Sequence, residues 1–513
     1  MVTEIMSGGI FGVECRPVRV ETDVSNGLPM IEMVGRLSAE VKEASKRVRV
    51  ALKNVDINLP PKRITINLAP ADEQKEGTGY DLAIALSLLA GLSLIPPESL
   101  AGRFAAGELA LDGRVCRING ILPMVLKARE MGIKTCILPR DNSEEARAVS
   151  GIEIIGVGNI TEALNWMRGK KPQSSESEFK DLFKESEKIN TYPDFADIHG
   201  QEGLKRAMMI AAAGFHNLLM IGPPGAGKTM AAKRLPGILP PITREESLEV
   251  SKIYSAAGLL DNTKPLVTLR PFVAPHHTAS VYALSGGGRT PKPGLISRAH
   301  RGVLFLDEAV HFSSQTLEVL RQPMEDKEIR IDRATGSCIF PADFMLVAAI
   351  NPCPCGNYPD PNLCRCGADQ VRRYLSKLSG PLLDRIDICT EMSRLDVKDI
   401  RNNKKNDDSQ CSSRMRQKVL EARSRQDERF KSLDIRFNSQ MNPAYIEEFI
   451  PLSGNEAAFM DKAYEKMHLS LRSYHKILRV ARTIADIDGK KDVELSCLQE
   501  ALCYRSIEER YWT

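Results

Sequence analysis

The sequence predicts an α/β fold whose central part is a parallel β-sheet with helices on both faces. Three observations predict it. The short apolar run His216–Ile221 is followed by a glycine-rich loop and then by residues that favour a helix. Two more apolar runs, Gly302–Leu306 and Phe344–Ile350, end in polar side chains. Fully apolar strands that alternate with helices are typical of parallel sheets, because such sheets are buried on both faces.

Length and composition limit the class of protein. A chain of 513 residues is too long for one hydrophobic core, so we expect two to four domains. The net charge of +4 neither requires nor excludes a nucleic acid partner. The twelve cysteines are mostly scattered, which argues against a disulfide framework and for a reducing compartment. Residues 1–15 lack a signal-peptide pattern, and the most apolar stretch, Leu82–Ile95, is too short to cross a bilayer and favours a buried helix. We therefore expect a cytoplasmic protein without a membrane partner.

Composition also divides the chain into regions. Residues 1–168 contain short β-branched runs between glycine and proline turns, which predicts a folded domain. Residues 169–194 are rich in Lys, Ser and Glu and predict a linker. Residues 195–395 alternate strands and helices and form the predicted core, 396–416 are polar and predict a second linker, and 417–513 have helical periodicity.

The glycine-rich loop predicts a nucleotide site. Its sequence matches the pattern Gly-x4-Gly-Lys-Thr between a strand and a helix. Glycines allow backbone N–H groups to surround phosphate oxygens, and the helix N-terminus adds positive potential. We expect Lys228 to reach the β- and γ-phosphates of ATP and Thr229 to bind magnesium; a glycine turn without a ligand is the alternative. The predicted ATP-binding residues of the loop are Gly222, Pro223, Pro224, Gly225, Ala226, Gly227, Lys228 and Thr229.

Polar residues at the ends of the other two strands complete the predicted site. Asp307 and Glu308 follow the second strand, about 80 residues after the loop. Asp307 would hold the Mg²⁺ of bound ATP through water, and Glu308 would polarise the attacking water. Asn351 follows the third strand, and we expect it to orient that water between the two motifs. An asparagine before a proline is also a common turn starter, so the local sequence leaves both interpretations open.

Longer motifs carry a family resemblance over nearly the whole chain. The segments are Arg270–Ser280, Gly286–Gly288, Pro293–Gly302, Asn351–Gly356, Gly380–Asp387 and Tyr474–Ala485. With them the chain resembles the magnesium-chelatase-like AAA+ proteins of the ComM/YifB type. One departure is Ala309-Val-His-Phe312, where the family usually has Leu-Pro-Glu-Phe, so that a charge near the site is replaced.

The resemblance implies an AAA+ P-loop ATPase core with a C-terminal helical lid. It also implies that Arg385 is an arginine finger acting on a neighbour's nucleotide. Arg472, at the head of the helix that ends the chain, matches the second sensor. A guanidinium supplied by a neighbour makes hydrolysis depend on assembly, which implies a homo-oligomeric ring, a hexamer as in related proteins. For each arginine taken alone, a surface salt bridge is the alternative interpretation.

Residues 1–168 resemble the fold of the Lon protease domain, which is an α+β domain. The likeness is carried by Pro61–Pro70, Lys75–Leu82 and Gly107–Gly113. Gly79 stands where the protease has its nucleophilic serine and Leu122 where it has its lysine, and neither can perform nucleophilic catalysis. We therefore expect a non-catalytic interaction domain. Similar domains occur in bacterial recombination proteins, which associates the domain with DNA.

Four cysteines form two close pairs. Cys353-x-Cys355 and Cys364-x-Cys366 can supply four thiolates to a tetrahedral zinc ion, although the usual spacing is Cys-x2-Cys. A loop stiffened by proline and glycine, with free thiols, is the alternative.

Residues Glu328–Phe340 alternate polar and apolar side chains on both sides of a turn, which predicts a β-hairpin. In the replicative helicase relatives a hairpin at this place points into the central channel, and Arg333 aligns with its basic tip residue. One phosphate contact per subunit around a ring would give sequence-independent, salt-sensitive binding of DNA. A hairpin with solvated charges is the alternative.

These predictions favour a DNA motor. ATP hydrolysis around a hexamer would drive DNA through the channel, as a helicase or in branch migration, during recombination or natural transformation, with other recombination proteins as further partners. The first alternative is a chelatase-type motor subunit that remodels a partner protein in metal insertion. The front domain argues against it, because chelatase motor subunits begin near the P-loop. The second alternative is an ATP-dependent protease, against which Gly79 and Leu122 argue. The expected cofactors are ATP and Mg²⁺, with zinc as a further candidate.

Overall fold

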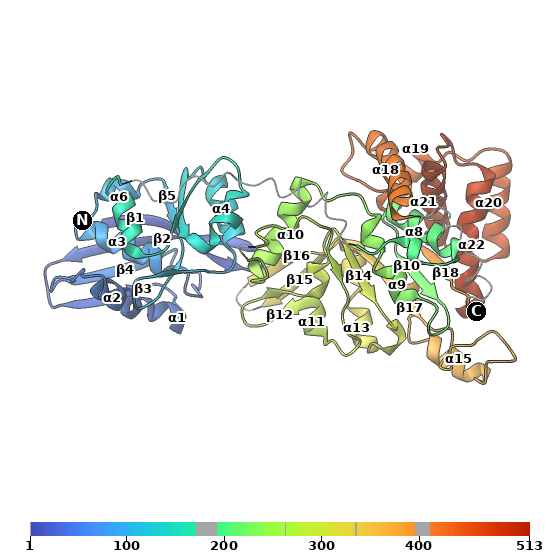
Figure 1. The fold of residues 1–513 in the computed structure, drawn as a ribbon, viewed down its shortest axis with the longest axis horizontal. Helices are drawn as coiled ribbons and strands as arrows, with labels where there is room; N and C mark the ends of the chain where they lie inside the picture. The colour runs from blue at the N-terminus through green and yellow to red at the C-terminus, as the bar shows by residue number, and fades with distance from the viewer. Residues whose placement is uncertain (1, 171–191, 262, 334–335, 395–410, 513) are drawn as a thin grey trace.

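The chain forms three regions in a row along its long axis (Figure 1). We call residues 2–170 the front region, 192–394 the core region and 411–512 the helical region. Most of the two predicted linkers, 169–194 and 396–416, lies outside the described residues. The computed structural model describes residues 2–170, 192–261, 263–333, 336–394 and 411–512.

The front region is built on a seven-stranded mixed sheet with the strand order β3-β4-β2-β1-β5-β8-β9. Helix α3 (Asp81–Gly91) packs on β1 and β2 and is almost fully buried, which confirms the buried helix predicted in this stretch. The strands of this sheet are β1 (Val2–Phe11), β2 (Glu14–Ser25), β3 (Met30–Val34), β4 (Arg63–Ala69), β5 (Arg103–Ala105), β8 (Thr135–Pro139) and β9 (Glu153–Val157).

Shorter elements complete the front region. Helix α4 (Ile121–Glu130) packs against α10 (Arg244–Ala256) of the core region, and this contact joins the two regions. The N–H of Gly120, just before α4, donates to the carbonyl of Ser255 in α10 at 3.0 Å. The remaining elements are α1 (Ala39–Lys42), α2 (Ala44–Asn54), α5 (Ser143–Arg147), α6 (Ile160–Met167) and the strand pair β6 (Glu108–Leu109) and β7 (Val115–Cys116).

The core region contains a five-stranded sheet with the order β11-β14-β17-β10-β18, and all its neighbours are parallel. The predicted α/β architecture and its three apolar strands are therefore confirmed. In the register, Ile221 pairs with Ile350 and Leu306 with Ala348, so the carboxyl ends of β10, β14 and β17 meet at one edge. The strands are β10 (Leu218–Ile221), β11 (Phe272–Val273), β14 (Val303–Leu306), β17 (Met345–Ile350) and β18 (Ile388–Glu391).

Helices and two hairpins surround this sheet. The hairpin of β15 (Glu328–Arg333) and β16 (Gly336–Pro341) confirms the predicted β-hairpin, and β12 (Gly286–Gly287) with β13 (Lys292–Pro293) forms a second one. The helices are α8 (Glu202–Gly214), α9 (Lys228–Ala232), α10 (Arg244–Ala256), α11 (Val281–Ser285), α12 (Leu295–Arg298), α13 (Ser314–Glu318), α14 (Arg321–Asp326), α15 (Ala368–Leu375) and α16 (Gly380–Leu383).

The helical region differs from the prediction at two points. Its first helix begins at Ser412, inside the predicted linker 396–416, because that serine is held in place: its Oγ accepts from the N–H of Phe195 and its N–H donates to Asp194, both at 2.8 Å. Arg472 lies in the first turn of α21, but α21 does not end the chain. Gly489, with φ 72°, stops it, and a further helix follows. The helices are α18 (Ser412–Arg429), α19 (Pro443–Phe449), α20 (Asn455–Lys466), α21 (Leu471–Ile487) and α22 (Leu495–Trp512).

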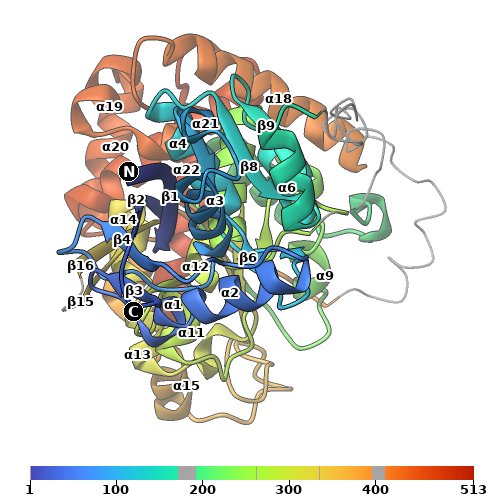
Figure 2. The same cartoon turned by 90° about the vertical axis from the view of Figure 1, so that its left-hand side faces the viewer.

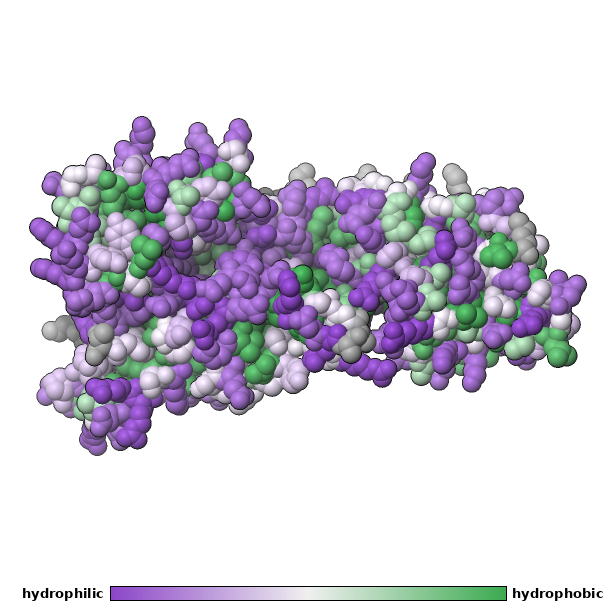
Figure 3. Space-filling model, turned by 180° about the vertical axis from the view of Figure 1, so that it is seen from behind, coloured by the Kyte–Doolittle hydropathy of each residue, from purple (hydrophilic) through white to green (hydrophobic). Residues whose placement is uncertain are grey.

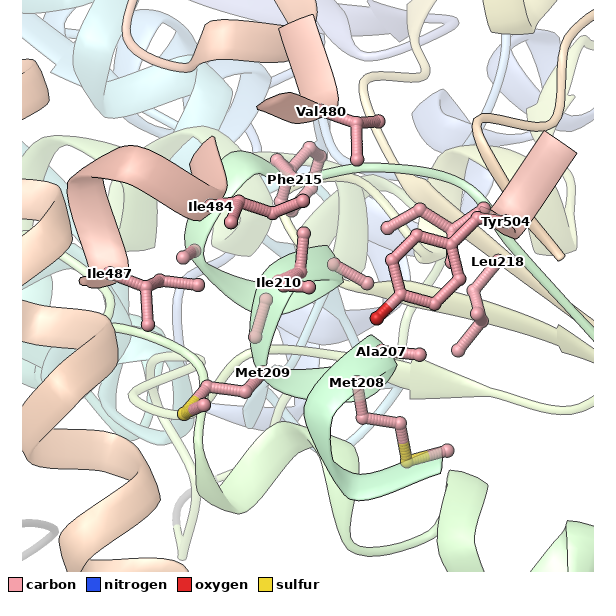
Figure 4. Packing of buried hydrophobic residues seen from close by; sticks show 14 of the residues in the cluster. Ala207, Met208, Met209, Ile210, Phe215, Leu218, Val480, Ile484, Ile487 and Tyr504 are labelled. Atoms are coloured by element: carbon pink, nitrogen blue, oxygen red, sulfur yellow. The ribbon is translucent and has the colours of Figure 1, made fainter. Parts of the chain in front are cut away.

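Helix α8 joins the core and helical regions through one hydrophobic cluster. Ile210 and Met208 of α8 lie among Ile484 of α21 and Tyr504 of α22 (Figure 4). The cluster continues into the sheet through Leu218 of β10. A buried hydrogen bond from the Gln426 side chain of α18 to the carbonyl of Ala213, at 3.1 Å, adds to this contact.

One face of the molecule is mostly polar (Figure 3). Figure 3 shows hydrophilic side chains over most of one face, with small apolar patches between them. Seen along the long axis, α18, α19 and α20 lie at one side of the molecule and α15 at the opposite side (Figure 2). Among the helices of the described residues, none combines the length and the apolar character that a membrane span needs.

Candidate functional site

The carboxyl edge of the core sheet brings the predicted nucleotide residues together. The ammonium group of Lys228 donates to the Oδ1 atom of Asn351 at 2.9 Å. The hydroxyl of Thr229 donates to the Oδ2 atom of Asp307 at 2.7 Å. Residues from three separate strand ends thus meet in one site, because parallel strands deliver their carboxyl ends to the same edge.

The phosphate loop, Gly222–Thr229, has the conformation that its glycines allow. Gly225 and Gly227 have φ values of 77° and 91°, in the left-handed region that favours glycine. Helix α9 begins directly after Gly227, so its N-terminal N–H groups face the loop. Burial lowers the pKa of Lys228, while the charges of Asp307 and Glu308 act in the opposite direction. Because burial disfavours the charged form of Lys228, an anion bound beside the ammonium group would stabilise its charge.

Glu308 lies at the open side of this site. Its backbone is left-handed, with φ 48°, which is uncommon for a residue other than glycine. The side chain is half exposed, and its Oε2 atom lies 3.6 Å from Nδ1 of His311. The ring of His277 in turn lies 6.1 Å from that of His311. Sequence reasoning missed His311 as a neighbour of Glu308; the departure at Ala309–Phe312 was the available signal.

The two predicted arginines lie at the other end of β10. The carbonyl of Arg385 accepts from the Asn217 side chain at 2.8 Å, and Asn217 directly precedes β10, whereas the phosphate loop directly follows it. The four residues of β10 span roughly 13 Å. Arg385 and Arg472 are brought together there, because both guanidinium groups pair with Glu325 at the end of α14.

These arginines line a cavity of about 530 Å³. The side chain of Arg385 is only 11% exposed, so it is held in one place. Although partial burial raises the pKa of Glu325, hydrogen bonds from Arg385 and Arg472 outweigh this effect and keep the pKa below its usual value. Glu325 was not predicted, because only the fold brings it to the arginines. Charged residues that line the cavity are Glu325, Lys327, Asp384, Arg385, Asp387, Asp434, Arg472, Lys476 and Arg479.

The four predicted cysteines form one cluster. Their sulfur atoms all lie within 4.8 Å of one another. Cys353 Sγ is 3.3 Å from Cys355 Sγ and 3.8 Å from Cys364 Sγ, and Cys353 is fully buried. Backbone hydrogen bonds from residues 365 and 357 lower the pKa of Cys355 to about 6. The four thiols that form two pairs in the sequence therefore lie together in one cluster in the structure.

The hairpin β15–β16 carries Arg333 at the end of its first strand. Arg333 is exposed and pairs across the hairpin with Gly336. A Cβ atom on Gly287 would lie 3.4 Å from its guanidinium, so the hairpins β12–β13 and β15–β16 are neighbours. Gly336 in turn lies against Phe11, the last residue of β1 in the front region. The described end of the hairpin, at Arg333 and Gly336, thus lies where the core and front regions meet.

In the front region, the sequence resemblance to a Lon-type protease puts Gly79 at the position of the nucleophilic serine. Gly79 offers no side chain, and Leu122 is fully buried. The neighbouring hydroxyl of Thr78 donates to the carboxylate of Glu108. The buried ammonium group of Lys75 donates to the carbonyl of Glu73 at 2.9 Å and to that of Pro70. These contacts hold the loop 70–78 and leave neither group poised for catalysis.

Comparisons with known proteins place the chain in a family. The family model for magnesium chelatase, subunit ChlI, matches residues 194–400, that for subunit ChlI of Mg-chelatase matches 20–142, and that for the subunit ChlI C-terminal part matches 409–505. Competence protein ComM of Haemophilus influenzae is 42% identical over 507 residues, 98% of this chain and 97% of the relative. The chain belongs to the magnesium-chelatase-like family of the ComM/YifB type. The predicted resemblance is confirmed.

Other relatives differ in how much of the chain they cover. Protein YifB of Escherichia coli is 40% identical over 501 residues, 97% of this chain and 96% of the relative. The magnesium-chelatase 38 kDa subunit of Cereibacter sphaeroides is 29% identical over 174 residues, only 31% of this chain and 52% of that subunit. Members of the magnesium-chelatase-like family are AAA+ ATPases that use ATP and Mg²⁺. The parallel sheet and its loop agree with that class.

Proposed function

We propose that the protein is an ATP-hydrolysing ring motor that acts on DNA. The observation that carries the proposal is the meeting of Lys228, Thr229, Asp307 and Asn351 at one edge of a parallel sheet, with two arginines held at the opposite end of β10. A site divided in this way needs a neighbouring chain to complete it. The full-length likeness to a competence protein supports DNA as the substrate.

The residues of the phosphate loop have distinct proposed roles. Gly222–Thr229 surrounds the phosphates of ATP, and Lys228 contacts the β- and γ-phosphates. The hydroxyl of Thr229 and the carboxylate of Asp307 form an oxygen donor set that suits Mg²⁺, which would neutralise charge on the phosphates. Glu308 polarises the attacking water, and Asn351, which already contacts Lys228, orients it.

The proposed arginine finger acts between chains. Arg385 cannot reach its own phosphate loop across the length of β10, so it serves the nucleotide of a neighbour. Arg472, the proposed second sensor, lines the same cavity and would face the same phosphates. This contact joins two different surfaces of the chain. Repeated around a closed symmetry, it produces a ring, for which we propose six subunits.

The hairpin surface is the proposed contact with DNA. Arg333 on β15–β16 lies beside β12–β13, whose turn carries the exposed Arg289. Two adjacent basic residues per chain, repeated around a ring, would bind phosphates without reading sequence. The test is the ATPase rate with and without forked DNA. Marked stimulation supports the DNA motor. An unchanged rate favours the alternative, a chelatase-type motor that remodels a partner protein.

Arg333→Ala should separate DNA coupling from hydrolysis. We expect the basal ATPase rate to stay, while stimulation by forked DNA and strand separation fall, because the change removes a phosphate contact and no nucleotide contact. The salt dependence of DNA binding should also become weaker by about one phosphate per chain. The matched control is Arg330→Ala on the same strand, where the guanidinium is paired with Glu328 at 3.4 Å. Equal effects of the two changes would remove the specific role of Arg333.

The cysteine cluster is a proposed zinc site. Zn–S bonds of about 2.3 Å in a tetrahedron put neighbouring sulfurs roughly 3.8 Å apart. The separations among Cys353, Cys355 and Cys364 are 3.3, 3.7 and 3.8 Å, and all four sulfurs lie within 4.8 Å of one another, so small movements would fit them to the ion. One sulfur, that of Cys353, is buried, and the site also lies within a loop that has no helix or strand of its own. The proposed role of the metal is structural.

Zinc content is the direct measurement. We expect purified protein to carry about one zinc per chain under reducing conditions without chelator. Cys353→Ser combined with Cys364→Ser should lose the metal, because it removes one thiolate from each pair. The control pair Cys411→Ser with Cys503→Ser changes two thiols outside the cluster and should keep the zinc. Absence of zinc from the unchanged protein would leave free thiols as the better interpretation.

The alternatives account for less of the chain. A chelatase-type motor explains the phosphate loop and the arginines, and a family model described as subunit ChlI of Mg-chelatase also matches residues 20–142. The magnesium-chelatase 38 kDa subunit itself, however, aligns with less than a third of the chain. An ATP-dependent protease requires a nucleophile that Gly79 does not supply. We further propose that the front region, residues 1–168 in the predicted division, is a non-proteolytic module that contacts DNA or other recombination proteins.

A further inference from the structure

The cysteine loop, residues 352–367, lies directly against the phosphate loop. Gly356 packs on the ring of Pro224: a Cβ atom added to Gly356 would lie 2.2 Å from Cδ and 2.8 Å from Cγ of that ring. Gly356 also has φ 80°, which glycine adopts without strain. The two loops are therefore in close contact, and a shift of either one moves the other.

The strand before the cysteine loop makes two more connections to the phosphate loop. The carbonyl of Ile350, the last residue of β17, accepts from the N–H of Gly222 at 3.2 Å. The next residue, Asn351, accepts from Lys228 at 2.9 Å. Cys353 follows two residues later and is fully buried. One short segment therefore carries both the lysine contact and the first thiol of the cluster.

The cysteine loop is held by turns and side-chain contacts and has no regular secondary structure: the N–H of Cys364 donates to the carbonyl of Asp360 at 2.8 Å, and Arg394 donates to the Oδ1 atom of Asn357 at 3.0 Å. Between Asn351 and Gly367 the described chain contains no helix or strand. Cys353 and Cys355 lie near its start, and Cys364 and Cys366 near its end, so one ion would tie both ends together. Loops of this length without secondary structure are uncommon and are usually functional or disordered. An ion bound at both ends would order this one.

We propose that the metal in the cysteine cluster fixes the position of the phosphate loop, so that ATP turnover depends on the bound metal. The inference rests on the proposed zinc site and gives that site a function. With the ion, Gly356 presents a fixed surface to Pro224, and Asn351 holds Lys228. Without it, both supports can shift, and a displacement of about 1 Å in a reacting group can cost roughly 10²-fold in rate.

The experiment compares two proteins in two metal states. Wild type and Gly356→Ala are assayed with zinc, and again after chelation, removal of the chelator and addition of Mg²⁺ in excess. Gly356→Ala should keep its zinc and lose about tenfold or more in ATP turnover, because the new methyl group displaces Pro224. Stripped wild type should fall similarly and recover when zinc is returned. Stripping Gly356→Ala should add little, since both changes act through one contact.

The matched control is Gly132→Ala in the front region. Gly132 has φ 75°, and an added Cβ atom would meet nothing within 4 Å, so this change carries the backbone strain without the contact. It should leave both zinc content and turnover unchanged. If zinc removal unfolds the chain, the coupling is tested by one comparison: the ATP turnover of zinc-loaded Gly356→Ala against that of zinc-loaded Gly132→Ala.

The outcomes distinguish the coupling from the metal site. Folded, zinc-free wild type that hydrolyses ATP at the zinc-loaded rate would overturn the coupling and leave the metal site standing. Normal turnover in zinc-loaded Gly356→Ala would overturn it as well. A wild-type chain that neither contains nor takes up zinc would remove the metal site first, and the coupling with it.

Discussion

Arg385→Ala is expected to bind ATP normally and to hydrolyse it more slowly, by up to about 10³–10⁵-fold. The guanidinium is separated from its own phosphate loop by the length of β10, so its removal leaves ATP binding within the chain unchanged. The substitution removes the guanidinium only from the neighbour's active site, where in the transition state it would spread the charge of the transferring phosphoryl group. Nucleotide affinity and single-turnover rates measure the two steps separately.

The position of the finger can be tested by mixing two inactive chains. Lys228→Ala lacks an intact phosphate loop, and Arg385→Ala lacks the finger, so some interfaces in a mixed ring pair an intact loop with an intact finger. Partial ATPase activity should therefore return, once energy transfer between labelled chains has shown that subunits exchange. Arg373→Ala, an exposed arginine on α15, is the single-site control and should stay active. Full ATPase activity in Arg385→Ala alone would exclude the finger.

Lys228→Ala and Glu308→Gln should fail at different steps. Lys228→Ala is expected to abolish nucleotide binding, because the ammonium group is the main charge facing the phosphates. Glu308→Gln should keep binding and lose hydrolysis, because the amide cannot polarise water as the carboxylate does. Binding of a fluorescent ATP analogue and phosphate release measure these steps. Lys233→Ala, an exposed lysine just after α9, should change neither quantity.

Near-normal turnover in Glu308→Gln would contradict its assignment as the residue that positions water. His311 would then be the first residue to examine, since its Nδ1 atom lies 3.6 Å from the Glu308 carboxylate. Retained ATP binding in Lys228→Ala would instead place the phosphates away from the loop.

Much of the nucleotide site could be predicted because its signals are local. A strand, a glycine loop and a helix occupy adjacent residues, and the polar ends of β14 and β17 follow apolar runs that predict buried parallel strands. Parallel pairing then forces Asp307 and Asn351 to the edge where the loop lies. The prediction that the helix carrying Arg472 ends the chain was wrong. The sequence signal for the end of that helix is weak, because it is a single glycine, Gly489, within a long charged segment.

Contacts between distant residues could not be predicted. Glu325 meets Arg385 and Arg472, and the second of these lies 147 residues away in the chain. Nothing in the sequence around a solvent-facing glutamate indicates such partners. The packing of Gly356 on Pro224 is of the same kind, since the glycine alone indicates a turn and not what the turn touches. Local sequence patterns determine the individual helices and strands. These contacts between distant residues form only when the fold brings those helices and strands together.

The cluster around α8 also determines which parts of the chain can exist alone. Met208 and Ile210 face α21 and α22 rather than solvent, and the same cluster reaches β10. A fragment truncated after residue 394 would therefore expose the apolar side of α8 to water. Such a fragment would aggregate rather than retain a working loop. We therefore expect the core sheet and the C-terminal helices to fold and unfold as a single unit.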